Sequence, residues 1–407
     1  MTNSYINRDK LILIMDLIRN YSEKFEKFEE RLKDIELSRT NKLLLKNFSD
    51  YLLASGISKG RVLKYASHLI HIAGILNKDL DKASREDLIK VIGEIEKKNY
   101  SAWTKHDYKV ALKKFYKWLK GEQEGRAFTD WFKVTVKNNN KKLPEELLSV
   151  EDIEKLASAS SNLRDKAFVL ALYESGARIG EFLPIKIKQV EFDNYGALLT
   201  LHGKTGSRKI RLITCVPALI QWLDSHPCKN DKEAFVWVKV KANNGNEVIT
   251  YAEACKILKE LAKKAGISKP VNPHHFRHSR ATELAKHLTE AQLCEYLGWV
   301  QGSDEASTYV HLSQRDIESA ILKLHGIEVE EEKELEFKPI VCPRCKKQNS
   351  PGSKFCSLCG LALDLKSAIE LDSKLESMAE IFANLLEDSK TRRMIVREAL
   401  RKGLKIR

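Results

Sequence analysis

Two pairs of closely spaced cysteines carry the clearest chemical signal in the sequence. Cys342-Pro-Arg-Cys345 and Cys356-Ser-Leu-Cys359 are CxxC pairs separated by ten residues, and Gly360 follows the second pair. Four thiolates at this spacing suit the tetrahedral coordination of Zn²⁺, and they leave no position open for a substrate. We therefore predict a structural zinc site here, rather than a redox pair or disulfides.

Four short segments combine arginine, lysine, histidine and tyrosine in one part of the chain. They read ESGARIGEFL at 174–183, HGKTGSRKIRL at 202–212, NPHHFRHSRAT at 272–282 and LGWVQGSDEASTYVHL at 297–312. Each segment is a weak signal alone. In this order and with this content they resemble the tyrosine recombinase (phage integrase) family, and the resemblance covers roughly residues 38–325.

That resemblance implies which side chains carry the reaction. Matched to the family's motifs in this sequence, the catalytic set is Arg178, Lys204, His274, Arg277, Trp299 and Tyr309, with Glu181 and His278 in support. It also implies that no metal or other cofactor takes part in catalysis. The cysteine pairs resemble a zinc ribbon, which the recombinase core does not require, so the ribbon is expected to be an appended module.

The residue types suit a reaction at a phosphodiester. Transesterification builds negative charge on the non-bridging oxygens, and fixed cations stabilise that charge. A guanidinium group stays charged and offers a planar fork of donors, so Arg178 and Arg277 would clamp the phosphate. Glu181 lies three residues after Arg178 and would hold that guanidinium or a neighbouring histidine. Tyr309 would keep the bond energy in a covalent intermediate, because a phenol leaves more readily than an alkyl alcohol.

Two of these assignments have local competitors. Lys204, at the tip of an expected hairpin, would protonate the leaving 5′ oxygen, but Lys209 is an alternative in the same segment. Tyr296 competes with Tyr309 as the nucleophile. We favour Tyr309 because it follows Trp299 by ten residues in a stretch with Gly, Ser and Asp, which predicts a loop suited to a mobile nucleophile. Tyr296 lies instead in a helical apolar pattern.

The histidines and the tryptophan have more specific expected roles. His274 would accept or share the tyrosine proton, because imidazole titrates near neutral pH. His278 is expected to be a structural residue at a helix start with Glu181 as a candidate partner, and His275 is expected to point away. Trp299 stands where the family more often has His, and its indole N–H only donates, so it would brace the phosphate without carrying protons.

Periodicity and turn signals indicate the elements that position these residues. Apolar residues from Ile14 to Ile35 recur in steps of four and three, which predicts one amphipathic helix over 9–36 that packs within its own domain or pairs with another helix. Residues 197–201 and 210–213 are β-type runs joined by a Gly-containing turn, which predicts a hairpin. The expected fold class is mainly α with a small β-hairpin or sheet (α+β).

The predicted domain order follows from these patterns and from shifts in composition. It runs 1–36 N-terminal amphipathic helix, 37–136 all-helical core-binding DNA-clamp domain, 137–148 linker, 149–327 tyrosine recombinase catalytic domain, 328–339 acidic linker, 340–364 zinc ribbon and 365–407 C-terminal helix with a basic end.

Composition agrees with a nucleic-acid partner. The 407 residues include 70 Lys and Arg against 56 Asp and Glu, a net charge of +14, and a polyanion is the natural partner for such an excess. The alternative is that charged residues, at 31% of the chain, only solvate the surface. The longest apolar run near the start, Leu11 to Met15, is far below the ~18 residues of a membrane span, so no membrane partner is expected.

We therefore predict a site-specific DNA recombinase or integrase that cleaves and rejoins DNA through a 3′-phosphotyrosine intermediate, without ATP. A catalytically silent, sequence-specific DNA-binding regulator and a type IB-like topoisomerase remain open as alternatives. The expected partners are double-stranded DNA, further copies of the chain in what the family implies to be a tetramer, and a protein bound through the ribbon or the C-terminal helix. The expected location is the cytoplasm, with the nucleoid.

Overall fold

The computed structural model describes residues 16–136, 146–203, 206–240, 245–312, 321, 325, 337–387, 393–394, 397–398 and 401. The described residues form two compact units, one ending at residue 136 and the other beginning at residue 146. Lys204, most of both predicted linkers and most of the predicted basic end lie outside the described residues. None of the described helices is long and apolar enough to span a membrane.

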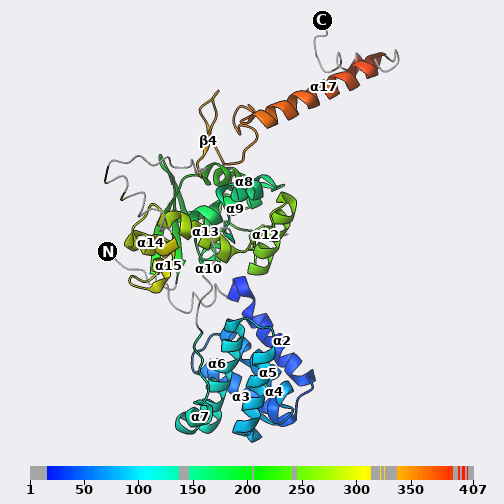
Figure 1. Ribbon diagram of the computed structural model, residues 1–407. Coiled ribbons are helices and arrows are strands. Elements are labelled where there is room, and N and C mark those ends of the chain that lie inside the picture. The colour runs from blue at the N-terminus through cyan, green and yellow to red at the C-terminus, as the bar shows by residue number, and fades with distance from the viewer. Residues whose placement is uncertain are drawn as a thin grey trace. The chain divides into compact units, whose positions relative to one another are not determined.

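The N-terminal unit is a bundle of helices around one apolar core (Figure 1). Its helices are α2 (Tyr21–Asp34), α3 (Arg39–Ala54), α4 (Lys59–Leu76), α5 (Arg85–Lys97), α6 (Ala102–Lys120) and α7 (Glu122–Thr129), with a 3₁₀ turn at Leu80–Lys82. Ser38, Ser84 and Ser101 begin α3, α5 and α6 by accepting a backbone N–H of the first turn. The prediction that this region is helical is confirmed.

The N-terminal segment differs from the single helix predicted over 9–36. Asn20 has a left-handed backbone with φ 52°, which interrupts the helix, and α2 begins only at Tyr21. Phe25 and Leu32 of α2 are buried in the core that α3 to α6 share. Of the two alternatives for this segment, the described part packs within its own domain.

The second unit combines helices with a three-stranded antiparallel sheet of order β1-β2-β3. Its elements are α8 (Val150–Ser158), α9 (Leu163–Ser175), α10 (Ile179–Phe182), a 3₁₀ turn at Ile187–Gln189, β1 (Val190–Asp193), β2 (Gly196–Gly203), β3 (Gly206–Leu212), α11 (Val216–Asp224), α12 (Tyr251–Ala265), α13 (Pro273–Ala285), α14 (Glu290–Leu297) and α15 (Asp304–Leu312). Beyond them lie β4 (Ile340–Val341), β5 (Gln348–Asn349) and α17 (Leu365–Glu387).

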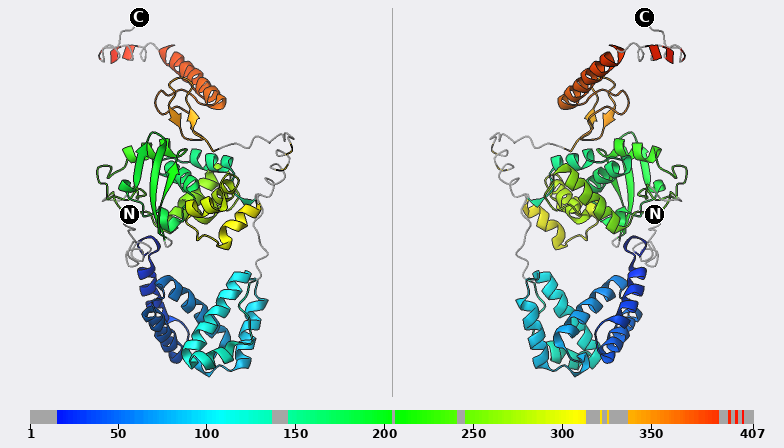
Figure 2. Two further views of the ribbon diagram at one scale, coloured as in Figure 1. Left: turned by 90° about the vertical axis from the view of Figure 1, so that its left-hand side faces the viewer. Right: turned by 90° about the vertical axis from the view of Figure 1, so that its right-hand side faces the viewer.

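The sheet lies along one side of the helices of this unit, as both views of Figure 2 show. β3 contacts α9 and α14, and β2 contacts α10. The helix α9 is buried along most of its length, which explains why its apolar residues show no single face. The predicted hairpin is confirmed as β2 and β3, and β1 adds a strand that the sequence pattern did not predict. The mainly helical α+β fold class is confirmed.

A buried carboxylate connects α9 to the end of the hairpin. Glu174 Oε1 accepts the backbone N–H groups of Ile213 (2.8 Å) and Thr214 (2.9 Å), and its Oε2 accepts that of Cys215 (2.8 Å). These residues immediately precede α11, where the free N–H groups and the helix dipole favour a negative charge. The contact therefore fixes β3 and α11 against the central helix of the unit.

Replacing this carboxylate is expected to destabilise the second unit. Glu174→Ala would leave three N–H groups without their charged acceptor and should lower the free energy of unfolding by about 3 kcal/mol, measured by equilibrium urea unfolding. Glu233→Ala is the control, because Glu233 is an exposed carboxylate that pairs with Lys186 and Lys188 and should cost less than about 1 kcal/mol. Equal losses for the two variants would contradict the structural role of Glu174.

Candidate active site

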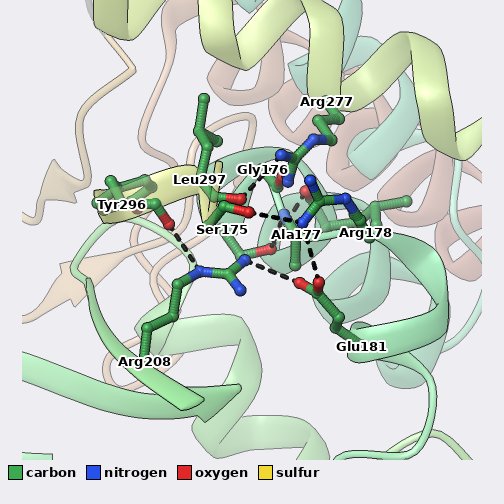
Figure 3. A network of polar contacts seen from close by, with 11 residues as sticks. Ser175, Gly176, Ala177, Arg178, Glu181, Arg208, Arg277, Tyr296 and Leu297 are labelled. Atoms are coloured by element: carbon green, nitrogen blue, oxygen red, sulfur yellow. Dashed lines mark hydrogen bonds and ion pairs between the residues drawn. The ribbon is translucent and has the colours of Figure 1, made fainter. Parts of the chain in front are cut away.

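Three arginines from different elements converge on the C-terminal end of α14 (Figure 3). Three consecutive backbone carbonyls each accept an N–H from a different guanidinium group: Tyr296 from Arg208 (2.8 Å), Leu297 from Arg277 (2.8 Å) and Gly298 from Arg178 (2.9 Å). The last carbonyls of a helix lack partners in their own helix and carry its partial negative charge, so they attract cations.

The way in which α14 ends makes these carbonyls available. Gly298 has φ +65°, and its N–H bonds to the carbonyl of Glu295, while the N–H of Trp299 bonds to the carbonyl of Cys294. This glycine cap satisfies the two earlier carbonyls and turns the chain, so that the three arginines take the next three.

Arg277 is the most deeply buried of the three cations. It lies on α13 with only 6% of its surface exposed, and Nη1 also donates to the carbonyl of Gly176 (2.8 Å). Burial, followed by the positive charge of Arg178, lowers the pKa of Arg277 to about 10. The guanidinium thus remains charged at neutral pH in a place where a neighbouring anion would stabilise it.

Arg178 and Arg208 share one carboxylate. Glu181 Oε1 is 3.2 Å from Arg178 Nη1, and Glu181 Oε2 is 2.8 Å from Arg208 Nη2. The side chain of Arg178 is 42% exposed, whereas that of Glu181 is only 6% exposed. The predicted contact between Glu181 and Arg178 is therefore present, and Arg178 is the cation that solvent reaches most easily.

Tyr309 lies among the predicted catalytic residues, but in a helix. It is part of α15 rather than of the predicted loop, and it is 5% exposed. Its hydroxyl bonds to Nδ1 of His278, and its ring stacks on Trp299 with centroids 5.2 Å apart. Burial raises the pKa of Tyr309 well above its usual range, the charge of Glu305 raises it further, and Arg277 opposes the shift. The phenol is thus protonated and covered in this arrangement.

The two histidines of the HxxRH motif are arranged in series. Nε2 of His278 lies 2.6 Å from Nε2 of His274, so that His278 stands between His274 and the phenol of Tyr309. This position differs from the expected one, a structural histidine at the helix start with Glu181 as a candidate partner. His278 follows α13's first turn, and its ring nitrogens face Tyr309 and His274. His275 points away as predicted, with Nε2 2.6 Å from the carbonyl oxygen of Glu146.

Trp299 contacts both a cation and the candidate nucleophile. Its ring stacks on Tyr309, and Cζ of Arg277 lies 5.2 Å from its ring centroid, which is cation–π distance. Tyr296, the competitor of Tyr309, has its hydroxyl bonded to the carbonyl of Glu174 at 3.0 Å, and burial raises its pKa to about 12. Tyr296 therefore has a structural partner, whereas the hydroxyl of Tyr309 faces the histidines.

The hairpin supplies a cation that the sequence reasoning missed. Lys204 lies outside the described residues, and its alternative Lys209 pairs with Glu191 (3.3 Å) on the exposed part of the sheet. Arg208 was not assigned a role. The signal that could have found it is strand alternation, because Arg208 shares a face of β3 with the buried Ile210 and Leu212.

The four cysteines form one cluster, with their Sγ atoms all within 4.8 Å of one another. Two equivalent turns present them. The N–H of Lys346 bonds to the carbonyl of Cys342 and that of Gly360 to the carbonyl of Cys356, and both turn residues have positive φ. The amide of Asn349 also approaches Cys356 Sγ at 3.7 Å. Four sulfur donors so close together, with an N–H directed at one of them, fit a tetrahedral metal site.

Residues 340–364, which carry the four cysteines and are called the cysteine module below, are held against the helices of the same unit. Ser158 Oγ donates to the carbonyl of Gly352 (3.0 Å), and Lys166 Nζ donates to Ser353 Oγ (3.1 Å). The ring of Phe337 packs edge-on against Tyr173 of α9 at 5.0 Å. These contacts involve α8 and α9 and none of the predicted catalytic side chains.

Comparison with known proteins finds matches over both units. Residues 146–315 match the phage integrase family, and residues 45–123 match the phage integrase N-terminal SAM-like domain. The chain is 26% identical to tyrosine recombinase XerA of Pyrococcus horikoshii over 292 residues, which is 71% of this chain and 95% of that protein. It is 25% identical to tyrosine recombinase XerD of Listeria innocua over 296 residues, 69% of this chain and 98% of that protein.

Two solved structures share the fold. The XerH recombinase in a post-cleavage complex with its palindromic difH substrate has a TM-score of 0.51 and 20% identity, covering 77% of this chain and 97% of that one. A lambda integrase dimer bound to a core site has a TM-score of 0.51 and 16% identity, covering 65% of this chain and 75% of that one.

The close approach of Gly298 to Arg208 can be tested by adding a methyl group. A Cβ at Gly298 would lie 2.7 Å from Arg208 Nη1, and the backbone there has φ +65°. Gly298→Ala should therefore cost more stability than Gly266→Ala, which has a similar φ of +69° at the end of α12 but open space around it. We expect about 1 kcal/mol for Gly266→Ala and about 2–3 kcal/mol for Gly298→Ala in equilibrium urea unfolding. Equal costs would show that Arg208 is not held against Gly298.

Proposed function

The chain belongs to the phage integrase family as a Xer-like tyrosine recombinase, and from this premise we propose that it cleaves and rejoins DNA with Tyr309 as its nucleophile. The observation that carries this proposal is the position of the Tyr309 hydroxyl, which bonds to His278 next to Arg277 and Trp299. Among the tyrosines considered, Tyr309 combines a proton acceptor with nearby guanidinium groups.

The proposed reaction exchanges one phosphate ester for another. Tyr309 Oη attacks the scissile phosphorus, and the new P–O bond forms as the P–O5′ bond breaks. The phenolic proton passes to Nδ1 of His278, which bonds to the phenol, rather than directly to His274 as predicted from the sequence. The products are a 3′-phosphotyrosine and a free 5′ hydroxyl, whose proton we assign to Lys204 from the family's pattern. The 5′ hydroxyl of a second duplex then attacks the 3′-phosphotyrosine, and Tyr309 regains its proton. The number of ester bonds is conserved, so the reaction needs no ATP.

Arg178 and Arg277 would bind the non-bridging oxygens. Each donates to backbone carbonyls at the end of α14 or beside it and has further N–H groups for a phosphate. A phosphodiester carries one negative charge and a phenol that has lost its proton adds a second, so two guanidinium charges match the transition state better than the ground state.

Binding of DNA would have to uncover the nucleophile. Tyr309 and Arg277 are both buried in the free protein, so a phosphate cannot reach both until α15 shifts away from Trp299. Such a step would keep the chain from attacking DNA before the site is assembled. His278 bonds to the phenol and is itself bonded to His274, so this pair would orient the phenol during the shift.

Double-stranded DNA and further copies of the chain are the proposed partners. The lambda integrase structure is a dimer bound to a core site, which supports binding of DNA by more than one copy. A tetramer on two duplexes, which the family implies, would supply the second 5′ hydroxyl for strand exchange. The net charge of +14 would supply general affinity for the DNA backbone. A regulator without catalysis or a type IB-like topoisomerase is less favoured, and we place the recombinase with the nucleoid in the cytoplasm.

Cys342, Cys345, Cys356 and Cys359 would hold a structural Zn²⁺. The metal would join the two turns and so stabilise a module that has only two-residue strands, β4 and β5, among its described elements. It would supply no step in the reaction. The surface of this module or α17 is where we would expect a protein partner to bind.

The first test is capture of the covalent intermediate. The full chain would select its site from a random-sequence duplex library, and the selected duplex, nicked so that the cleaved fragment diffuses away, would trap the adduct on a denaturing gel. Wild type should form the adduct and Tyr309→Phe should form none, because the phenyl ring has no nucleophile. Tyr296→Phe is the matched control and should keep adduct formation within about tenfold, since its hydroxyl makes only structural bonds.

Two results would overturn this assignment. One is an adduct that survives Tyr309→Phe but not Tyr296→Phe. The other is the absence of any adduct with wild type on the selected duplex, which would favour a DNA-binding regulator.

The second test is metal removal. We expect elemental analysis to find about one zinc per chain, and Cys342→Ser with Cys356→Ser to abolish it. Adduct formation by this variant should stay within about tenfold of wild type, because the cysteine module contacts α8 and α9 rather than the catalytic side chains. A chain that purifies without zinc would contradict the proposed structural role. Complete loss of adduct formation when the metal is removed would contradict it too.

A further inference from the structure

Arg208 occupies a position in the candidate site to which the family's catalytic motif assigns no residue. It projects from β3, opposite Leu201 of β2, and its side chain is only 10% exposed. Nε donates to the carbonyl of Tyr296 and Nη2 to Glu181 Oε2, both at 2.8 Å. Its third nitrogen, Nη1, is buried and has no hydrogen-bond partner among the residues that the structure describes. A buried cation held by a single carboxylate is costly unless the local charges require it.

The charges around Glu181 explain why a buried cation is needed at this position. Glu181 is the carboxylate that pairs with both Arg178 and Arg208. Its pair with Arg208 is shorter, 2.8 Å against 3.2 Å, and both partners are almost fully buried, whereas Arg178 is 42% exposed. Coulomb attraction is stronger at short distance and low dielectric, so Glu181 is neutralised mainly by Arg208. The charge of Arg178 is therefore left largely uncompensated.

We propose that Arg208 is a positioning residue that neutralises Glu181, so that Arg178 and Arg277 keep their full charge for the scissile phosphate. This inference rests on the proposed function and deepens it. Without Arg208, Glu181 would turn both oxygens to Arg178, cancel its charge and compete with the phosphate for its N–H groups. Arg208 also lies against Gly298, whose carbonyl holds Arg178, so that it supports the orientation of the same guanidinium.

Charge removal at both partners tests this role. Arg208→Gln should slow adduct formation on the selected nicked duplex by about tenfold to a hundredfold, because Glu181 then neutralises Arg178. The double variant Glu181→Gln with Arg208→Gln should recover most of that loss, since no carboxylate remains to compete. Arg211→Gln is the matched control, because Arg211 lies on the same strand but pairs with Asp193 away from the site, and its rate should equal that of wild type.

Adduct formation on an uncharged substrate provides a second test of the role of Arg208. A methylphosphonate at the scissile position removes the negative charge that Arg178 and Arg277 are proposed to bind, so the defect of Arg208→Gln should shrink to about threefold or less relative to wild type on the same substrate. A residue needed only for folding would slow both substrates equally, and thermal unfolding of each variant would reveal that loss.

The outcomes separate this role from the function itself. An adduct with wild type but no recovery in the double variant and equal defects on both substrates would overturn the role of Arg208 alone. No adduct with wild type would overturn the proposed function, and the role of Arg208 with it.

Discussion

The arrangement of the candidate site depends on the backbone carbonyls at the C-terminal end of α14. Tyr296, Leu297 and Gly298 each hold one guanidinium group without neutralising it, because a carbonyl carries only a partial negative charge. Three arginines can therefore converge although, within the part of the chain that the structure describes, Glu181 is the one carboxylate that pairs with any of them. Holding each of them with its own carboxylate would fix the same geometry but leave no positive charge for a phosphate. A helix end thus both orients the cations and preserves their charge.

The same segment also positions the proposed nucleophile. Trp299 follows Gly298 directly, and its ring contacts both Arg277 and Tyr309. A change at the end of α14 would therefore alter the positions of the phosphate-binding arginines Arg178 and Arg277 and of the Tyr309 phenol together. Glu174 extends this coupling to the sheet, because it fixes the end of β3 while its own carbonyl accepts the hydroxyl of Tyr296. Contacts of α9 and α14 thus connect the phosphate-binding arginines, the nucleophile Tyr309 and the β2–β3 hairpin.

Sequence reasoning reached the parts of this site that motifs encode locally. Arg178, Arg277 and Tyr309 follow from short segments of the sequence, because each lies in a recognisable local motif. Strand alternation would have placed Arg208 on the buried face of β3, but its partner Tyr296 is 88 residues away and no local pattern identifies that contact. Sequence reasoning also placed Tyr309 in a loop, since Gly302 and Ser303 suggested a turn that ends just before α15 begins. The direction of His278 depends on where α15 packs, which no local pattern specifies.

The most direct test of this account is a structure of the full chain on its selected duplex with the scissile phosphate replaced by orthovanadate, which mimics five-coordinate phosphorus. We expect Arg178 and Arg277 to contact the non-bridging oxygens while the carbonyls of Tyr296, Leu297 and Gly298 keep their guanidinium partners, and Tyr309 Oη to be bonded to vanadium. A clamp in which any of the three arginines has left its carbonyl to reach the vanadate, or a vanadate bound away from Tyr309, would contradict the account.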